Sequence, residues 1–250
     1  MAARQTLVLA PDGPFSGGSQ VTASIFPAVE AATLRLRAAL ARVADAASSL
    51  AGKPPEDLAF EGEMIRSRAS NAGERLADVL ARTAAEDLAA EGESAATDHG
   101  KLAATGMGYG AIFVEIGVDP GFGEVRVLRV CGAFAPGRIL NPLLARSQYI
   151  GGLVGGIGMA LHEQTVTDRA TGCILGKSLS DYLLPVHADM PEFDIAMIEE
   201  DDPRLPGSVK GIGMLGTAGI QAAIANAVYD AIGRRVRKLP IRIEDCLAGG

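Results

Sequence analysis

The sequence predicts an α+β fold, with mixed helix and strand, in which β-hairpins pack with long helices rich in alanine and glycine. Its 250 residues are 48% hydrophobic and 21% charged, a composition typical of a globular chain with a real core. Short alternating apolar runs separated by turn residues predict the hairpins. Longer apolar runs with caps and stops predict the helices. No repeated strand–helix–strand unit is visible, so a regular parallel sheet is not expected.

Residues 14–51 predict a buried helix, with Ser24 as its cap, a start near Ile25 and an end at the "GKPP" of residues 52–55. A small hairpin is expected around Glu61, and "GERLADVLART" predicts a short amphipathic helix. Residues 86–106 indicate a weak strand and a loop. We therefore expect two regions, 1–105 and 106–250, that together form one structural unit.

The second region carries stronger signals. The β-rich runs "GAIFVEIGVD" and "EVRVLRVCGAF", joined by "PGFG", predict a hairpin. A long helix should follow, capped by Asn141, and the small-residue spacing within "YIGGLVGGIGMAL" predicts close helix packing. Residues 178–185 and 192–200 favour strands, and the acidic run 199–202 favours a solvated loop. The last long helix should start near residue 219 and stop at Gly233.

Charge and composition exclude several classes of function. The formal charge of −7 argues against binding to nucleic acid or to an anionic membrane. Three scattered cysteines, without a CxxC pair, and three scattered histidines make a zinc site improbable, and the cysteines are expected in the core. The longest apolar stretch is too short to span a membrane and the N-terminus resembles no secretory signal, so a cytoplasmic location is expected.

The stretch "KGIGMLG", residues 210–216, has the glycine spacing of a dinucleotide fingerprint. The strand that should precede it is interrupted by prolines, and the acid that should follow a second strand is missing, so dinucleotide binding is rejected. Two interpretations stay open: glycines that let the backbone approach an anion or polar ligand, and a close backbone crossing without a ligand.

A second glycine cluster, "SGGSQVTAS" at residues 16–24, also supplies hydroxyls and backbone donors directly before a helix. An ordinary capped loop is the alternative for this cluster. Two such loops in one chain favour a split site for a phosphate-bearing cofactor more strongly than either loop does alone. No Ser-His-Asp arrangement, carboxylate pair or metal motif competes with this interpretation.

The order of these segments resembles one family. "GPFSGGSQVTAS", "GRILNPLLARSQYIGGLVGGIGMALHEQTVTD", "SLSDYLLPVHADMPEFDI" and "VKGIGMLGTAGIQAAIANAVYDAIGRRVRKLPI" are similar to the C-terminal part of molybdenum hydroxylases, the xanthine dehydrogenase/aldehyde oxidase family, above all bacterial aldehyde oxidase molybdenum subunits. The resemblance covers residues 14–247. It implies a molybdopterin-type molybdenum cofactor, with the cytosine dinucleotide form as one option, and an oxidoreductase that oxidises aldehydes or N-heterocycles with oxygen from water.

The resemblance also implies site residues. Cofactor contacts carry over to Gly18, Ser19, Gln20, Thr22, Ala23, Ser24, Lys210, Gly211, Ile212 and Gly213. The family's "KGxGE" loop carries a glutamate that acts as general base, and Met214 stands at that position. A thioether cannot accept a proton, so we expect weak or no activity from this chain alone. A family glutamine beside the metal is replaced by Gly155.

The family's partners complete the expectation. An N-terminal half of the molybdenum subunit supplies further cofactor contacts and part of the substrate funnel, while iron–sulfur clusters and FAD sit on partner subunits. This chain is similar to the C-terminal part of the subunit, so binding of a small-molecule aldehyde or heterocycle substrate is expected to require a complex. A location in the periplasm is expected only through a signal on a partner subunit. The alternative is a catalytically silent fragment or cofactor-binding homologue.

Overall fold

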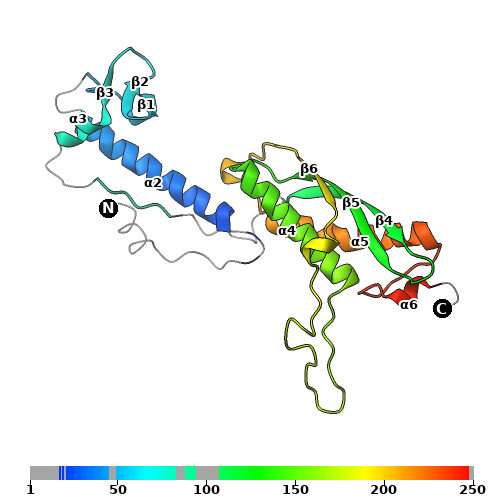
Figure 1. Ribbon diagram of the computed structural model, residues 1–250. Coiled ribbons are helices and arrows are strands. Elements are labelled where there is room, and N and C mark those ends of the chain that lie inside the picture. Colours follow the sequence, from blue (N-terminus) through cyan, green and yellow to red (C-terminus); the bar gives the residue numbers. More distant parts are fainter. Residues whose placement is uncertain are drawn as a thin grey trace. The chain divides into compact units, whose positions relative to one another are not determined.

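The computed structural model describes residues 17, 19, 21–44, 49–82, 88–93 and 107–247 (Figure 1). The chain divides into two compact units. The smaller one comprises residues 24–102, and the larger one combines residues 1–23 with residues 103–250. Helix α2, Val21–Ala44, begins in the larger unit and runs through the smaller one.

The smaller unit contains a three-stranded antiparallel sheet. Its strands are β1 (Leu58–Glu61), β2 (Met64–Ser67) and β3 (Gly73–Arg75), in the order β1-β2-β3. The 3₁₀ turn η1 (Pro55–Asp57) precedes the sheet and helix α3 (Leu76–Ala81) follows it. A small core of buried apolar side chains joins these elements to the end of α2: Ala41, Leu50, Leu58, Ile65 and Val79.

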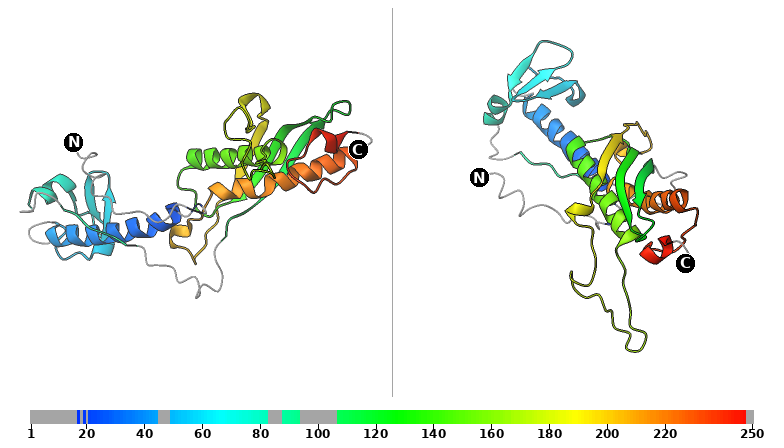
Figure 2. Two further views of the ribbon diagram at one scale, coloured as in Figure 1. Left: turned by 90° about the horizontal axis from the view of Figure 1, so that it is seen from below. Right: turned by 45° about the vertical axis from the view of Figure 1, so that its right-hand side comes forward.

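The larger unit is built on a second three-stranded sheet. Strands β4 (Tyr109–Val118) and β5 (Val125–Ala135) form an antiparallel hairpin, and β6 (Glu192–Met197) pairs with β5 in parallel. Helices α4 (Pro142–Leu161) and α5 (Gly213–Ile232) lie side by side along this sheet (Figures 1 and 2). The 3₁₀ turns η2 (His187–Asp189) and η3 (Pro206–Ser208) precede β6 and α5, and α6 (Ile243–Cys246) closes the unit.

The core of the larger unit lies between α4, α5 and the sheet. Phe134 of β5 stacks on Tyr149 of α4 with ring centroids 4.3 Å apart and planes 7° from parallel. Around this pair lie the other buried apolar side chains, which bury enough surface to hold the unit together by the hydrophobic effect. They are Val127, Val130, Leu153, Ile157, Ala160, Ile220, Ile224, Val228, Ile241 and Cys246.

The α+β class is confirmed, as are both hairpins, β6 and the two glycine-containing helices of the larger unit. Asn141 caps α4, because its Oδ1 accepts a hydrogen bond from the backbone N–H of Leu144 at 3.1 Å. Gly233 ends α5 in the left-handed region at φ 72°. Local capping and turn signals were therefore sufficient for these boundaries.

Four expectations about element boundaries are wrong. Helix α2 starts at Val21, so Ser24 lies within its first turn instead of capping it. It also ends at Ala44, before the "GKPP" of residues 52–55. Helix α5 starts at Gly213, six residues earlier than expected, because the glycine loop is itself the first turn. Helix α3 starts only at Leu76, because residues 73–75 pair with β2 as a strand.

Residues 178–185 were expected to form a strand and instead form a turn followed by irregular chain. Ser178 Oγ donates to Asp181 Oδ2 at 2.8 Å, and the carbonyl of Ser178 accepts the N–H groups of Asp181 and Tyr182. Such local side-chain and backbone bonds compete with a sheet ladder, which explains the wrong prediction. The three cysteines are free: Cys246 is buried, Cys131 is half-buried and Cys173 is exposed, so the core prediction is wrong for Cys173.

Candidate functional site

The glycine loop of residues 210–213 leads straight into α5. Ile212 packs against the main core of the larger unit, and this apolar contact fixes the loop at its centre. Ile212 is the N-cap residue of α5, but its side chain makes no capping hydrogen bond to the helix. The first turn of α5 contains no acidic residue. The positive end of the helix dipole is therefore not neutralised by a carboxylate from its own first turn.

Ser19 meets this helix start. The backbone N–H of Met214 donates a hydrogen bond to Ser19 Oγ at 3.1 Å. Ser19 itself has φ 63°, a left-handed conformation that costs a serine about 1–2 kcal/mol. Backbone strain of this kind persists only where the surrounding contacts hold it in place, and it occurs often at functional sites.

Gly213 is the point where three segments converge. A Cβ at Gly213 would lie 2.8 Å from Ser19 Oγ and 3.2 Å from Oε1 of Gln148, which belongs to α4. Only glycine leaves both polar side chains in place. The backbone of the first turn of α5 thus stands next to a hydroxyl and an amide, a polar surface at a helix N-terminus.

Other glycines allow α4 and α5 to approach each other closely. A Cβ at Gly216 would lie 2.8 Å from the carbonyl oxygen of Tyr149, and one at Gly152 would lie 3.0 Å from Thr217 N. A Cβ at Gly156 would overlap Cγ2 of Ile220. Close packing is confirmed for Gly152 and Gly156, whereas Gly151 and Gly155 have no heavy atom within 4 Å of such a Cβ.

Lys210 fixes the loop from the other side. Its side chain is only 5% exposed, and its Nζ lies 3.4 Å from Glu200 Oε2 and 3.4 Å from Asp202 Oδ2. The same ammonium donates to the carbonyl of Met107 at 3.4 Å, just before β4. Tyr109 donates its hydroxyl hydrogen to Glu200 Oε1 at 3.1 Å. A hydrogen-bonded charge network around the buried Lys210 therefore joins the glycine loop to the start of the sheet.

The prediction of a solvated loop for residues 199–202 is wrong for Asp202, whose side chain is 4% exposed. Arg204 donates to both carboxylate oxygens of Asp202, Nε to Oδ1 at 2.7 Å and Nη2 to Oδ2 at 2.8 Å. These bonds, with a smaller contribution from Lys210, hold the pKa of Asp202 far below its usual range. The negative charge of Asp202 is satisfied inside the protein, which is why this one member of the acidic run can be buried.

The remaining expected site residues are distributed as follows. Gly18 and Gln20 lie outside the described residues. Thr22 and Ala23 stand in the first turn of α2, within the larger unit, whereas Ser24 belongs to the smaller unit. The structure thus brings together Ser19, Gly213 and Met214.

Gln148, Glu200, Asp202 and Tyr149 were not singled out from the sequence. Gln148 lies in the first half of α4, three residues before Gly151, and only its position facing Gly213 reveals it. Tyr149 is fully buried, and its hydroxyl has no hydrogen-bond partner among the described residues. Burial raises the pKa of Tyr149 to about 12.

This arrangement can bind an anionic, hydrogen-bonding ligand. Backbone N–H groups at a helix N-terminus attract phosphate, and the neighbouring hydroxyl and amide supply further polar contacts. Within the described part of the chain, no three His, Cys, Asp or Glu side chains are arranged to hold a metal ion. Among the described helices, none is both long and apolar enough to cross a membrane.

Known proteins are similar to this chain. The family model of the molybdopterin cofactor-binding domain matches residues 3–191. The aldehyde oxidoreductase molybdenum-binding subunit PaoC of Escherichia coli K12 is 39% identical over 238 residues, which cover 93% of this chain and 30% of that subunit. The 6-hydroxypseudooxynicotine dehydrogenase complex subunit gamma of Paenarthrobacter nicotinovorans is 40% identical over 139 residues, 54% of this chain and 17% of that protein.

Solved structures share the fold. Cu,Mo-CO dehydrogenase superimposes with a TM-score of 0.76 at 19% identity, over 96% of this chain and 30% of that one. Quinoline 2-oxidoreductase from Pseudomonas putida 86 gives a TM-score of 0.68 at 23% identity, over 85% of this chain and 27% of that one. The chain spans less than a third of the length of these relatives. It belongs to the family of molybdopterin cofactor-binding domains and is homologous to the molybdenum-binding subunits of aldehyde oxidoreductase and xanthine dehydrogenase.

Proposed function

We propose that this chain forms the C-terminal, molybdenum cofactor-binding portion of a hydroxylase-type oxidoreductase that oxidises aldehydes or N-heterocycles. One observation carries the proposal. The N–H of Met214 donates to Ser19 Oγ, which joins the two glycine loops at the N-terminus of α5. When bound, the cofactor supplies the redox centre that oxidises the substrate with oxygen derived from water.

The residues at this point fit such a group. Gly213 keeps the backbone free of a side chain exactly where Ser19 and Gln148 face it, since a Cβ would lie within 3.2 Å of a polar atom of each. In our proposal the N-terminus of α5 holds the anionic part of the cofactor, and Ser19 orients the loop. Lys210 acts through its backbone, because its ammonium is already paired with carboxylates. Gly18, Gln20, Thr22, Ala23, Ser24, Gly211 and Ile212 complete the proposed contacts.

The proposal includes partners. The relatives are named as subunits, one of them within a dehydrogenase complex, and they are more than three times as long as the matched segment. We infer that the rest of a molybdenum-binding subunit, together with iron–sulfur and flavin subunits, completes the site in the cytoplasm. The cytosine dinucleotide form of the cofactor is one option within this proposal.

A second candidate function is a silent cofactor-binding homologue. The observation that favours it is Met214, which is 60% exposed in the first turn of α5. A methionine there can contact a ligand but cannot accept a proton. A positioned general base contributes about 10²–10⁴-fold to a rate, so this chain would bind the cofactor while turning over at least about a hundredfold more slowly than a glutamate-bearing relative.

The variant Met214→Glu separates the two candidates. The complex is purified with its partner subunits, its molybdenum content is measured, and oxidation of aldehydes and N-heterocycles is assayed. Turnover with Met214 in place would establish the enzyme and reject the silent homologue. Turnover only in Met214→Glu would identify the natural protein as silent. Leu128→Glu, a matched charge on the exposed side of β5, should change neither result. A metal-free complex in both forms would refute cofactor binding itself.

A further inference from the structure

Residues 163–186 form an arm between α4 and η2, visible in Figure 1 as a long excursion from the larger unit. The arm is ordered by its own contacts. Thr167 pairs with Ile174 as an isolated antiparallel bridge, and the N–H of Leu175 donates to the carbonyl of Val166 at 2.8 Å. At its tip Thr171 donates to Asp168 Oδ2 at 2.6 Å, which closes the turn. The arm is therefore a shaped element and not a slack connection.

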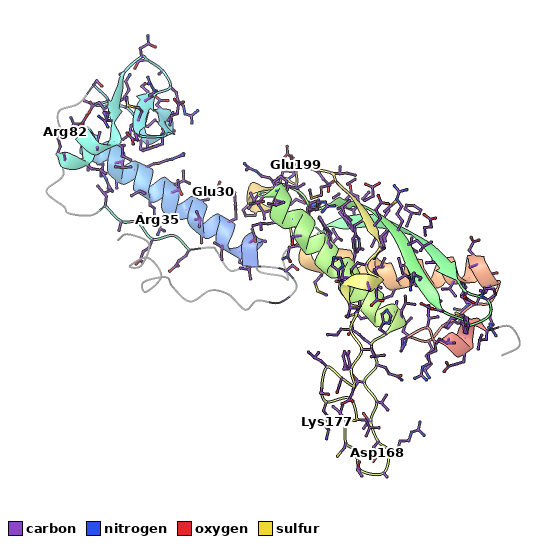
Figure 3. All side chains as sticks on the ribbon, in the orientation of Figure 1. Glu30, Arg35, Arg82, Asp168, Lys177 and Glu199 are labelled. Carbon is purple, nitrogen blue, oxygen red and sulfur yellow. The ribbon has the colours of Figure 1, made fainter. Side chains whose placement is uncertain are left out.

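Both ends of the arm are fixed to the same point of α4. The N–H of Glu163 donates to the carbonyl of Gly158 at 2.8 Å, and Tyr182 donates its hydroxyl hydrogen to Glu163 Oε2 at 2.9 Å. Pro185 lies against Gly158 so closely that a Cβ there would stand 2.9 Å from its Cδ. The base of the arm is thus held by packing, while the rest extends outward (Figure 3).

The arm exposes a dense set of large apolar side chains, and Leu179 is 80% exposed. The polar side chains of the arm bond to one another, as Asp168 does to Thr171 and Ser178 to Asp181, and so leave the apolar ones facing outward. Single exposed apolar residues are ordinary, but a group of them on one element marks an interaction surface. The group consists of Val166, Ile174, Leu175, Leu179, Leu183, Leu184 and Val186.

We propose that this arm docks onto the portion of a molybdenum-binding subunit that the present chain does not contain. The family model extends through the arm to residue 191, and the match to PaoC covers 93% of this chain but only 30% of PaoC. The arm therefore belongs to a segment that its relatives carry within a much larger subunit. The remainder of that subunit is the partner surface. This inference rests on the proposed function, since it names the contact through which the two portions assemble.

The chemistry of the arm specifies the partner surface. Its exposed large side chains are mostly aliphatic, its carboxylates at Asp168 and Asp181 are engaged within the arm, and its exposed charges are the cations Arg169 and Lys177. The complementary surface must therefore offer apolar pockets and not a strip of positive charge. Two leucines that become fully buried in such pockets contribute about tenfold to a hundredfold each to the affinity.

The test measures binding of the full chain to the part of E. coli PaoC outside the segment aligned with it, produced as a separate polypeptide. The double variant Leu179→Ser/Leu183→Ser removes apolar surface from the arm without touching its internal bonds. Phe122→Ser, 75% exposed on the β4–β5 turn, is the matched apolar control, and Arg169→Ser is the polar control on the arm. Circular dichroism confirms that every variant is folded.

We expect the double variant to raise Kd at least about a hundredfold, with both controls within about threefold of wild type. Equal binding by wild type and double variant, or no binding by wild type, overturns the arm proposal. Two further results would also overturn the proposal, because each would show that something else covers the arm. One is a homodimer of the chain that only the double variant dissociates, and the other is protection of the arm from proteolysis in the isolated chain. The molybdenum content of the complex is read separately, so its loss counts against the proposed function and not against the arm.

Discussion

Ser19 and Met214 stand 195 positions apart in the chain, yet the N–H of Met214 donates to Ser19 Oγ at 3.1 Å. This bond links a loop that precedes α2 to the first turn of α5. It satisfies one of the N–H groups that every helix leaves unpaired at its start, and it does so from a distant segment instead of from a local cap. The helix start is thereby coupled to the first glycine cluster.

Substitution of Gly213 should break this link. In Gly213→Ala the new methyl would stand 2.8 Å from Ser19 Oγ, so Ser19 must move and its bond to Met214 is lost. We expect the free energy of unfolding of the larger unit to fall by about 0.5–1.5 kcal/mol. Molybdenum content in the assembled complex should fall as well. Urea unfolding and metal analysis measure the two effects.

Ser19→Ala is the companion variant, because it removes the hydroxyl without adding a clash. It should reproduce the loss of molybdenum seen in Gly213→Ala. Full molybdenum content in both variants would contradict the role assigned to the Ser19–Met214 bond.

Two glycines one residue apart in α4 should respond in opposite directions to alanine. A methyl at Gly156 would overlap Ile220 Cγ2, so Gly156→Ala should destabilise the larger unit by about 1–3 kcal/mol. A methyl at Gly155 meets no atom within 4 Å, so Gly155→Ala should stabilise it by about 0.5–1 kcal/mol through helix propensity. Thermal and urea unfolding test both, and equal effects would refute the close helix contact.

Removal of the hydroxyl of Tyr149 should cost nothing at neutral pH. The hydroxyl is buried without a partner among the described residues, whereas the ring stacks on Phe134. Tyr149→Phe keeps the stack and should be neutral or stabilising by up to about 1 kcal/mol. Leu153→Ala, which empties a neighbouring core position, should instead cost about 2–5 kcal/mol and shows that the assay detects core damage.

The same variant should change the alkaline stability. Burial raises the pKa of Tyr149 to about 12, whereas tyrosine in the unfolded chain has a pKa of about 10. The unfolded state therefore loses its proton first, and stability falls as the pH rises from about 10 to about 12. Tyr149→Phe should lose this part of the decline, as measured by urea unfolding across that range.

Asp202 should make the stability sensitive to acid. The hydrogen bonds from Arg204 hold the pKa of Asp202 far below its usual range, so its contribution is present above the unfolded pKa of about 3.9. It is lost as the pH falls below that value. Asp202→Asn should be less stable than wild type at neutral pH, because Lys210 loses one of its two carboxylates, and should show a shallower decline below about pH 4.

Asp201→Asn is the matched control, since Asp201 is the exposed neighbour in the same loop. It should follow the wild-type stability at every pH. A parallel acid response of wild type and Asp202→Asn would show that the buried network does not govern acid unfolding. Urea titrations between pH 2 and pH 7 supply the measurement.

The elements that the sequence predicted well are those specified locally. The β4–β5 hairpin needs only alternating apolar residues around a turn, and α4 carries its own cap at Asn141. The resemblance to molybdenum hydroxylases pointed to both glycine loops and to Lys210 and Ile212 as cofactor contacts, but not to the way in which these two side chains fix the second loop. Ile212 and Lys210 hold the second loop by burial and charge, which no short motif displays.

Long-range contacts account for what could not be predicted. Pairing of β5 with β6 in parallel joins strands separated by α4 and the arm, and no periodicity signals it. The sequence places Asp202 in a run of four acidic residues that is typical of a solvated loop. In the structure Arg204 and Lys210 bind its carboxylate and it is buried. Gln148 gains its place only because the glycines of α4 and α5 let the two helices approach.

Because β5 and β6 are parallel, the chain must return to the other end of the sheet between them, and α4 forms this crossover connection. The arm is a detour added to it, pinned at Gly158 and Glu163 before the chain enters β6. Because the arm is held by its own turn and by its base on α4, and not by the β5–β6 ladder, a change in its length leaves the pairing of these strands unaltered. A change there would alter the proposed docking of the arm while the N-terminus of α5 stays unchanged.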